Sequence, residues 1–218
     1  MSSDLSVQRQ NASFVAGLEK GVLIAIARRL PRSVTPDGLT AFGVLGAVIV
    51  LFGYAASNWN VNYIWLANIG IVIHWLGDSL DGTLARVRQI ERPRFGFFID
   101  QTVDVIGNLL IAVGLGLSPW VRLDVALLML AAYHMLAIYA LVYSLVEGKF
   151  RVDVAGLGPT EARLGMIFLN LSVYIFGAPL LGWTENYLTW YDVTLLGIFS
   201  ALIILFLYEL FTKAASLK

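Results

Sequence analysis

Long apolar segments alternate with short polar ones along most of the chain. Six of these segments are apolar enough, and close enough to about 20 residues in length, to cross a hydrocarbon core of about 30 Å as helices. They cover residues 37–57, 61–80, 95–118, 123–146, 160–176 and 191–211. The pattern therefore predicts an all-α integral membrane protein with six transmembrane helices.

An N-terminal segment, residues 13–30, has a different pattern, because it is only moderately apolar. Its charged residues are Glu19, Lys20, Arg28 and Arg29. This mixture favours an amphipathic helix lying in the headgroup plane, and a soluble helix packed on the protein is the alternative. We therefore divide the chain into a polar N-terminus with an interfacial helix and a six-helix transmembrane domain. The two regions are residues 1–34 and 35–218.

Composition agrees with the membrane class. Apolar residues make up 58% of the 218 positions and charged residues 14%, whereas soluble domains carry about 25% charged residues. The formal net charge is zero, which gives no support for nucleic-acid binding. The chain contains no cysteine, so disulfides and thiol chemistry are excluded.

The basic residues predict the orientation in the membrane. If the N-terminus is cytoplasmic, all of the 15 Lys and Arg residues except Arg122 fall on the cytoplasmic side. This asymmetry is what the positive-inside rule requires, and it supports six crossings. In a bacterial host the membrane would be the inner one.

Four carboxylates lie between the second and third apolar segments, at Asp78, Asp81, Asp100 and Asp104. The first pair is spaced i,i+3 and the second i,i+4, so each pair shares one helix face. A lone aspartate near a helix end is usually a cap or a solvated residue. A turn over residues 86–94 would bring all four together, however, and like charges beside a bilayer core require a positive partner. Oxygen-only donors favour Mg²⁺, with Mn²⁺ as the alternative.

The same stretch carries small and basic residues at fixed spacings and reads D-x2-D-G-x2-A-R-x9-G-x3-D-x3-D. The positions are Asp78, Asp81, Gly82, Ala85, Arg86, Gly96, Asp100 and Asp104. This pattern resembles the signature of the CDP-alcohol phosphotransferase (CDP-alcohol phosphatidyltransferase) family, class I, which are membrane enzymes of phospholipid synthesis. The arrangement of apolar segments extends the resemblance to most of the chain.

The resemblance implies roles for the motif residues. It assigns Asp78, Asp81 and Asp100 to metal binding and Asp104 to the general base, also touching a metal, with two Mg²⁺ ions as the expected cofactor. It places the nucleotide at a second group of residues, where helix packing or, for the arginine, a topology-setting charge is the alternative. This group is Gly82, Ala85, Arg86 and Gly96.

The acceptor site is less marked in the sequence. Lys149, Arg151 and Arg163 flank the fourth and fifth segments on the cytoplasmic side and could hold a phosphorylated acceptor. Ordinary topology-setting charges are the alternative. Thr40 could reach the nucleotide, although a hydroxyl bonded to its own helix is the more common arrangement. His74 lies in an apolar segment and is assigned no role.

The leading functional hypothesis is transfer of a phosphatidyl group from CDP-diacylglycerol to an acceptor hydroxyl, with release of CMP. The first alternative is transfer from CDP-choline or CDP-ethanolamine to a diacylglycerol-like acceptor. Prenyl transfer, or an acid-lined cation transporter, are alternatives of other kinds. The family resemblance also implies a homodimer.

Overall fold

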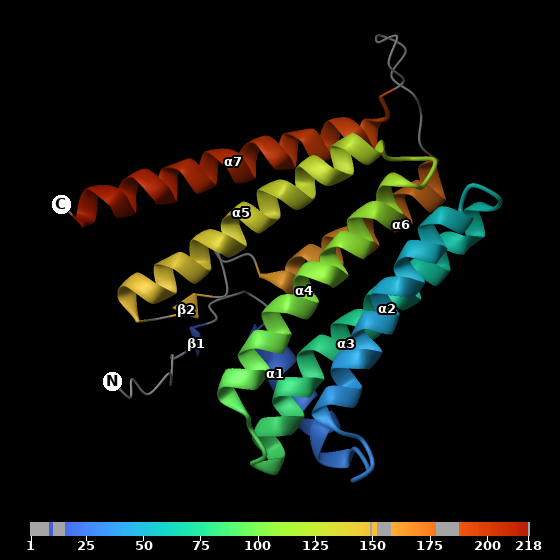
Figure 1. The fold of residues 1–218 in the computed structure, drawn as a ribbon. Coiled ribbons are helices and arrows are strands. Elements are labelled where there is room, and N and C mark those ends of the chain that lie inside the picture. Colours follow the sequence, from blue (N-terminus) through green and yellow to red (C-terminus); the bar gives the residue numbers. More distant parts are fainter. Residues whose placement is uncertain (1–8, 11–15, 149, 152–157, 178–187, 218) are drawn as a thin grey trace.

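The structure is a computed structural model that describes residues 9–10, 16–148, 150–151, 158–177 and 188–217. Its helices follow the order of the predicted segments (Figure 1). They are α1 (Ala16–Arg29), α2 (Pro36–Ala56), α3 (Ile64–Arg88), α4 (Pro93–Gly116), α5 (Leu123–Glu147), α6 (Pro159–Phe176) and α7 (Trp190–Ser216). A 3₁₀ turn, Val61–Tyr63, precedes α3. The short strands β1 (Arg9–Gln10) and β2 (Phe150–Arg151) pair in parallel. Apart from this pair of two-residue strands, the regular elements of the described residues are helical, so the all-α prediction is confirmed.

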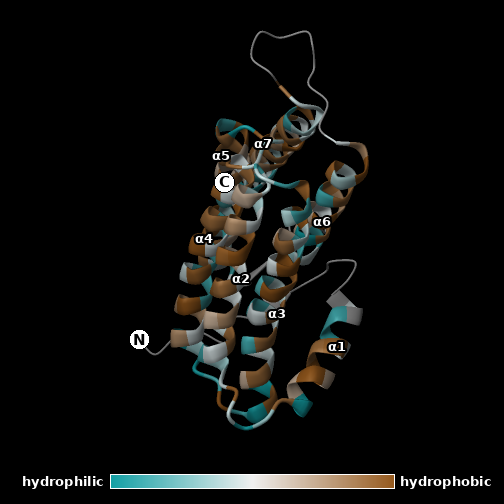
Figure 2. Ribbon diagram, turned by 90° about the vertical axis from the view of Figure 1, so that its right-hand side faces the viewer, coloured by the Kyte–Doolittle hydropathy of each residue, from teal (hydrophilic) through white to brown (hydrophobic). Residues whose placement is uncertain are grey.

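Four of the described helices are long and apolar enough to cross a membrane, namely α2, α4, α5 and α7. Hydrophobic residues predominate along the long helices in Figure 2, and hydrophilic ones gather at the turns at the lower end. The helices α3 and α6 do not reach the same hydropathy. In α3 the cause is the group of charged residues in its second half, from Asp78 to Arg88. Six crossings therefore stay a prediction.

The core of the bundle is the antiparallel pair α2 and α3, whose backbones approach closely through glycine. A Cβ on Gly46 would lie 2.8 Å from the Cα of His74 and 2.9 Å from the carbonyl oxygen of Gly70. A Cβ on Gly70 would lie 2.7 Å from the backbone nitrogen of Val50. Small residues permit such packing in membranes, where apolar lipid removes the hydrophobic driving force between helices. This pairing fixes the position of α3 along α2, and therefore the position of the acids that α3 carries.

We expect Gly46→Ala to destabilise the fold by about 1–3 kcal/mol, because the added methyl group meets backbone atoms that cannot rotate away. Gly197→Ala on α7 is the matched control, since a Cβ there has no atom within 4 Å. Alanine is the better helix former, so this control should be neutral or slightly stabilising. Thermal unfolding of the two variants in the same detergent compares them. Equal melting temperatures would contradict the close packing of α2 on α3.

A buried polar chain connects α6 to this pair. The Tyr54 hydroxyl donates to Asn170 Oδ1 at 2.9 Å, and Asn170 Nδ2 donates to Asn68 Oδ1 at 2.7 Å. Tyr54 and Asn170 are fully buried, so these hydrogen bonds satisfy groups that would otherwise be costly in an apolar interior. They hold α6 against the end of α2 and the beginning of α3, away from the acids.

The N-terminal helix α1 packs on the outer side of α3. Leu23 and Ala27 of α1 form an apolar cluster with Leu39 of α2 and with Leu80 and Leu84 of α3. The prediction of a helix in this region is confirmed. Its amphipathic character and its position in the headgroup plane stay predictions.

Candidate active site

The turn between α3 and α4 brings the two acid pairs together. The helix α3 ends at Arg88, and Gln89 adopts a left-handed conformation with φ of 56°. Pro93 then begins α4, where its missing N–H and fixed φ suit the first turn. Asp78 and Asp81 thus lie in the second half of α3, opposite the first turns of α4.

Three of the four acids form a tight cluster. Asp78, Asp100 and Asp104 each offer a carboxylate oxygen, and these atoms lie within 4.8 Å of one another. All three side chains are half-buried. Three like charges this close require a positive partner, and a hard divalent cation prefers oxygen donors of this kind. The residues therefore fit Mg²⁺ or Mn²⁺.

Asp81 lies beside this cluster and has different partners. It accepts a hydrogen bond from the Thr40 hydroxyl at 2.6 Å and another from the Gly82 backbone N–H. Thr40 also contacts the carbonyl oxygen of Pro36 at 3.2 Å, so the expectation of a bond within its own helix was incomplete. This threonine of α2 fixes the orientation of the Asp81 carboxylate.

All four acids line one cavity between α2, α3 and α4. The cavity is small and opens to solvent. The lining residues are Thr40, Gly43, His74, Asp78, Asp81, Asp100, Val103 and Asp104. This small, open cavity offers the oxygen donors that a hard cation prefers.

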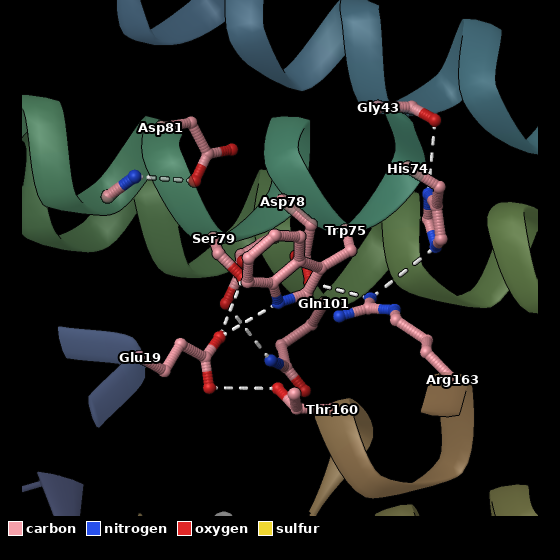
Figure 3. Close-up of polar contacts among 12 residues, drawn as sticks. Glu19, Gly43, His74, Trp75, Asp78, Ser79, Asp81, Gln101, Thr160 and Arg163 are labelled. Atoms are coloured by element: carbon pink, nitrogen blue, oxygen red, sulfur yellow. Dashed lines mark hydrogen bonds and ion pairs between the residues drawn. The ribbon is translucent and has the colours of Figure 1, made fainter. Parts of the chain in front are cut away.

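Arg163 of α6 supplies a positive charge to the cluster. Its Nη2 lies 2.6 Å from Asp78 Oδ2, and the two side chains are 11% and 22% exposed. Figure 3 shows the arginine reaching from α6 toward α3, with His74 on its other side. The guanidinium has five N–H donors in a fixed fork, so one arginine can contact Asp78 and a further acceptor together. Of the three basic residues predicted for the acceptor, this one reaches the acids.

The structure does not describe the side chains of the other two predicted acceptor residues. Lys149 lies outside the described residues. Arg151 belongs to β2, which pairs with β1, and its side chain is not described. Their role in acceptor binding stays a prediction.

His74 is a residue that the sequence left without a role. It is 2% exposed, and its Nδ1 lies 3.0 Å from the carbonyl oxygen of Gly43. Because a carbonyl only accepts, Nδ1 carries the proton, and Nε2 faces Arg163 Nη2 at 3.5 Å as an acceptor. The signal was the i,i+4 spacing from His74 to Asp78, which puts both on one face of α3.

The predicted nucleotide residues lie beside the acids. A Cβ on Gly82 would stand 3.5 Å from Arg86 Nη1, and a Cβ on Gly96 would meet no atom within 4 Å. Arg86 is exposed and donates to Thr83 Oγ1 at 3.1 Å, and Ala85 is half-buried on the same turn. Gly96 thus leaves open space near the α3–α4 turn, whereas Gly82 lies against the guanidinium of Arg86.

Arg88 and Arg92 have structural partners instead. Arg88 donates to the carbonyl oxygens of Leu30 at 3.0 Å and Pro31 at 2.9 Å, and Arg92 pairs with Asp37. These contacts tie the turn after α3 to the segment between α1 and α2. Arg88 and Arg92 therefore help to hold this turn in place.

Comparison with known proteins finds a matching family model and two curated relatives. The family model for CDP-alcohol phosphatidyltransferase matches residues 33–198. Over 125 residues the chain is 31% identical to the archaetidylinositol phosphate synthase of Pyrococcus horikoshii, covering 57% of this chain and 58% of that protein. Over 105 residues it is 36% identical to the phosphatidylinositol phosphate synthase of Cutibacterium acnes, covering 48% of each.

The chain spans about half the length of these curated relatives. The family model, by contrast, covers most of this chain and includes every motif residue from Asp78 to Asp104. The protein is therefore a member of the CDP-alcohol phosphatidyltransferase family.

Proposed function

We propose that this protein transfers a lipid phosphate group from a CDP-linked diacylglycerol-type donor to the hydroxyl of a phosphorylated polyol, with release of CMP. Family membership supports the donor class and a place in phospholipid synthesis. The observation that carries the proposal is the cluster of Asp78, Asp100 and Asp104 with Arg163 against it. It pairs a site for a cation with a site for an anionic acceptor.

The acids have distinct tasks in this proposal. Asp78, Asp81, Asp100 and Asp104 would hold Mg²⁺, two ions by the family pattern, which neutralise the donor pyrophosphate and stabilise the leaving CMP. Asp104 accepts the proton of the acceptor hydroxyl. The acceptor oxygen then forms a bond to the lipid-side phosphorus, and the bond from that phosphorus to the CMP oxygen breaks. Thr40 keeps Asp81 in place through its short hydrogen bond.

The nucleotide would lie over the open surface beside the α3–α4 turn. Gly96 leaves room for close approach there, since a Cβ would meet no atom within 4 Å. At Gly82 the nearest group is the flexible end of Arg86, and Ala85 adds little bulk. Arg86 is exposed and its guanidinium lies beside Gly82, and a guanidinium suits a pyrophosphate.

The acceptor proposal rests on Arg163 and on the names of the two relatives. A guanidinium binds phosphate through two parallel N–H bonds, and Arg163 lies directly beside the acids. Both relatives are named as synthases of inositol phosphate lipids. We therefore propose inositol phosphate as the acceptor, with Lys149 and Arg151 as further contacts.

The proposed membrane arrangement follows the charge pattern. We propose that α3 and α6 also cross the membrane, because α3 packs along α2 and α6 joins both through Asn170. The cytoplasmic side then holds the acids, where CDP-linked donors and Mg²⁺ are present. A homodimer is proposed from the family alone.

The experiment is CMP release by purified protein with Mg²⁺, using CDP-diacylglycerol, CDP-choline and CDP-ethanolamine as donors. Each donor is tested with inositol phosphate, glycerol phosphate, free inositol and diacylglycerol. We expect CMP with CDP-diacylglycerol and inositol phosphate, in equal amount to a new phospholipid, and far less with free inositol. CMP with the amino-alcohol donors and diacylglycerol would contradict the proposed donor. No CMP with any pair would contradict the transfer.

A further inference from the structure

Glu19 of α1 is the centre of a hydrogen-bonded group outside the cavity. Its Oε1 accepts from Trp75 Nε1 at 2.9 Å and from the Ser79 hydroxyl at 3.2 Å. Its Oε2 accepts from the Thr160 hydroxyl at 2.9 Å. Trp75 and Ser79 belong to α3 and Thr160 to α6, so one half-buried carboxylate joins three helices (Figure 3).

This group lies next to the ion pair of the site. Ser79 follows Asp78 directly in α3, and Thr160 precedes Arg163 by three residues in the first turns of α6. An i,i+3 spacing puts Thr160 and Arg163 on one face of α6. Glu19 therefore fastens the first turn of α6 to α3 at the level where Arg163 reaches Asp78.

The position of Glu19 is itself well fixed. Leu23 and Ala27, one and two turns further along α1, are buried against Leu80 and Leu84 of α3. A carboxylate that is half-buried costs free energy unless donors surround it. Here three donors from two helices satisfy it, so removing them or the carboxylate would release α6 from α3 at this end.

We propose that Glu19 is a positioning residue, which holds α6 so that Arg163 stays on Asp78 and competes there with a divalent cation. The inference rests on the proposed function in one respect, namely that the acids bind a cation. It adds that the N-terminal helix, through Glu19, sets the affinity of the site.

The test measures Mn²⁺ binding by electron paramagnetic resonance in purified full-length protein, so that it does not depend on transfer activity. Arg163→Met removes the competing charge and should tighten Mn²⁺ binding about tenfold. Glu19→Leu should tighten it in the same direction, by about threefold or more, because Arg163 leaves Asp78. The double variant should bind no more tightly than Arg163→Met, since both changes act through one contact.

Two variants distinguish the effect of Glu19 on the position of Arg163 from the effect of a change in charge on α1. Glu19→Gln keeps an oxygen for Trp75 and Ser79 and offers an amide to the Thr160 hydroxyl, so it should bind Mn²⁺ within about twofold of the unaltered protein. Lys20→Ala, an exposed neighbour on α1, should do the same. Thr160→Val removes only the hydrogen bond from α6 to Glu19. It replaces Glu19→Leu if that variant does not fold, and it should also tighten Mn²⁺ binding.

Three results would overturn the inference. Equal Mn²⁺ affinity in Glu19→Leu and Glu19→Gln would show that the hydrogen bonds of Glu19 do not position Arg163. Additive effects in the double variant would show that Glu19 acts independently of Arg163. Weaker binding in folded Thr160→Val would reverse the expected direction. Failure of the proposed transfer would appear separately, as absence of CMP release from a protein that binds Mn²⁺.

Discussion

Replacement of Asp104 by Asn is expected to lower CMP release by at least about 10²-fold, because a positioned general base contributes about 10²–10⁴-fold. The side chain keeps its size, so the cavity keeps its shape. Donor binding should persist, since Asp78 and Asp100 still offer carboxylate oxygens to the same position. Turnover is measured as CMP release, and donor binding by calorimetry on the same preparation.

The matched control is Asp124→Asn in the first turn of α5. Asp124 pairs with Arg122 at 2.7 Å, and its side chain is 61% exposed and lies outside the cavity. Loss of an exposed pair changes stability by about 1 kcal/mol or less, and turnover should be unchanged. Normal turnover in folded Asp104→Asn protein would remove the base role.

Asp78→Asn is expected to weaken Mn²⁺ binding and to lower stability together. The variant removes a cation ligand and leaves the guanidinium of Arg163, 11% exposed, without its charged partner. Asparagine can keep an oxygen toward the guanidinium but not the negative charge, and a hydrogen bond that loses its charged acceptor is weaker by about 1 kcal/mol. Mn²⁺ titration and thermal unfolding measure the two effects on one sample.

Asp37→Asn is the control for this experiment, because its partner Arg92 is exposed and stays solvated when the charge is lost. It should leave both the Mn²⁺ affinity and the melting temperature near their original values. An unchanged Mn²⁺ titration in Asp78→Asn would remove this residue from the cation site. An unchanged melting temperature would contradict the structural importance of the pair with Arg163.

Helix positions followed closely from the sequence, because long apolar segments bounded by Pro, Gly and Asn leave few alternatives. The prediction of 160–176 corresponds to α6 at Pro159–Phe176, and 123–146 to α5 at Leu123–Glu147. The largest difference is at α3, which continues to Arg88 beyond the predicted end at residue 80. Charged residues ended the apolar segment there, but they did not end the helix.

The arrangement of the acids was predictable because all four belong to consecutive helices joined by a short turn. The contacts from other helices were not. Arg163 reaches Asp78 across 85 residues of sequence, and Thr160 reaches Glu19 across 141. Spacing along one helix identifies a shared face, whereas the packing of α1 and α6 on α3 depends on tertiary contacts that no local pattern encodes.

His74 and Thr40 illustrate the same limit. Each is a common residue type in an apolar segment, where hydrogen bonds to its own surroundings are the ordinary arrangement. Their importance follows from the approach of α2 to α3, which puts Gly43 beside His74 and Thr40 beside Asp81. That approach depends on glycines whose function becomes evident only in the paired helices.

The most direct test of the acid cluster as the metal centre is the position of Mn²⁺ in crystals of the protein, determined from its anomalous scattering. We predict a peak within about 2–2.5 Å of carboxylate oxygens of Asp78, Asp100 and Asp104, as expected for a hard cation on oxygen ligands. A peak elsewhere, or none at these residues in Mn²⁺-saturated and active protein, would contradict the account.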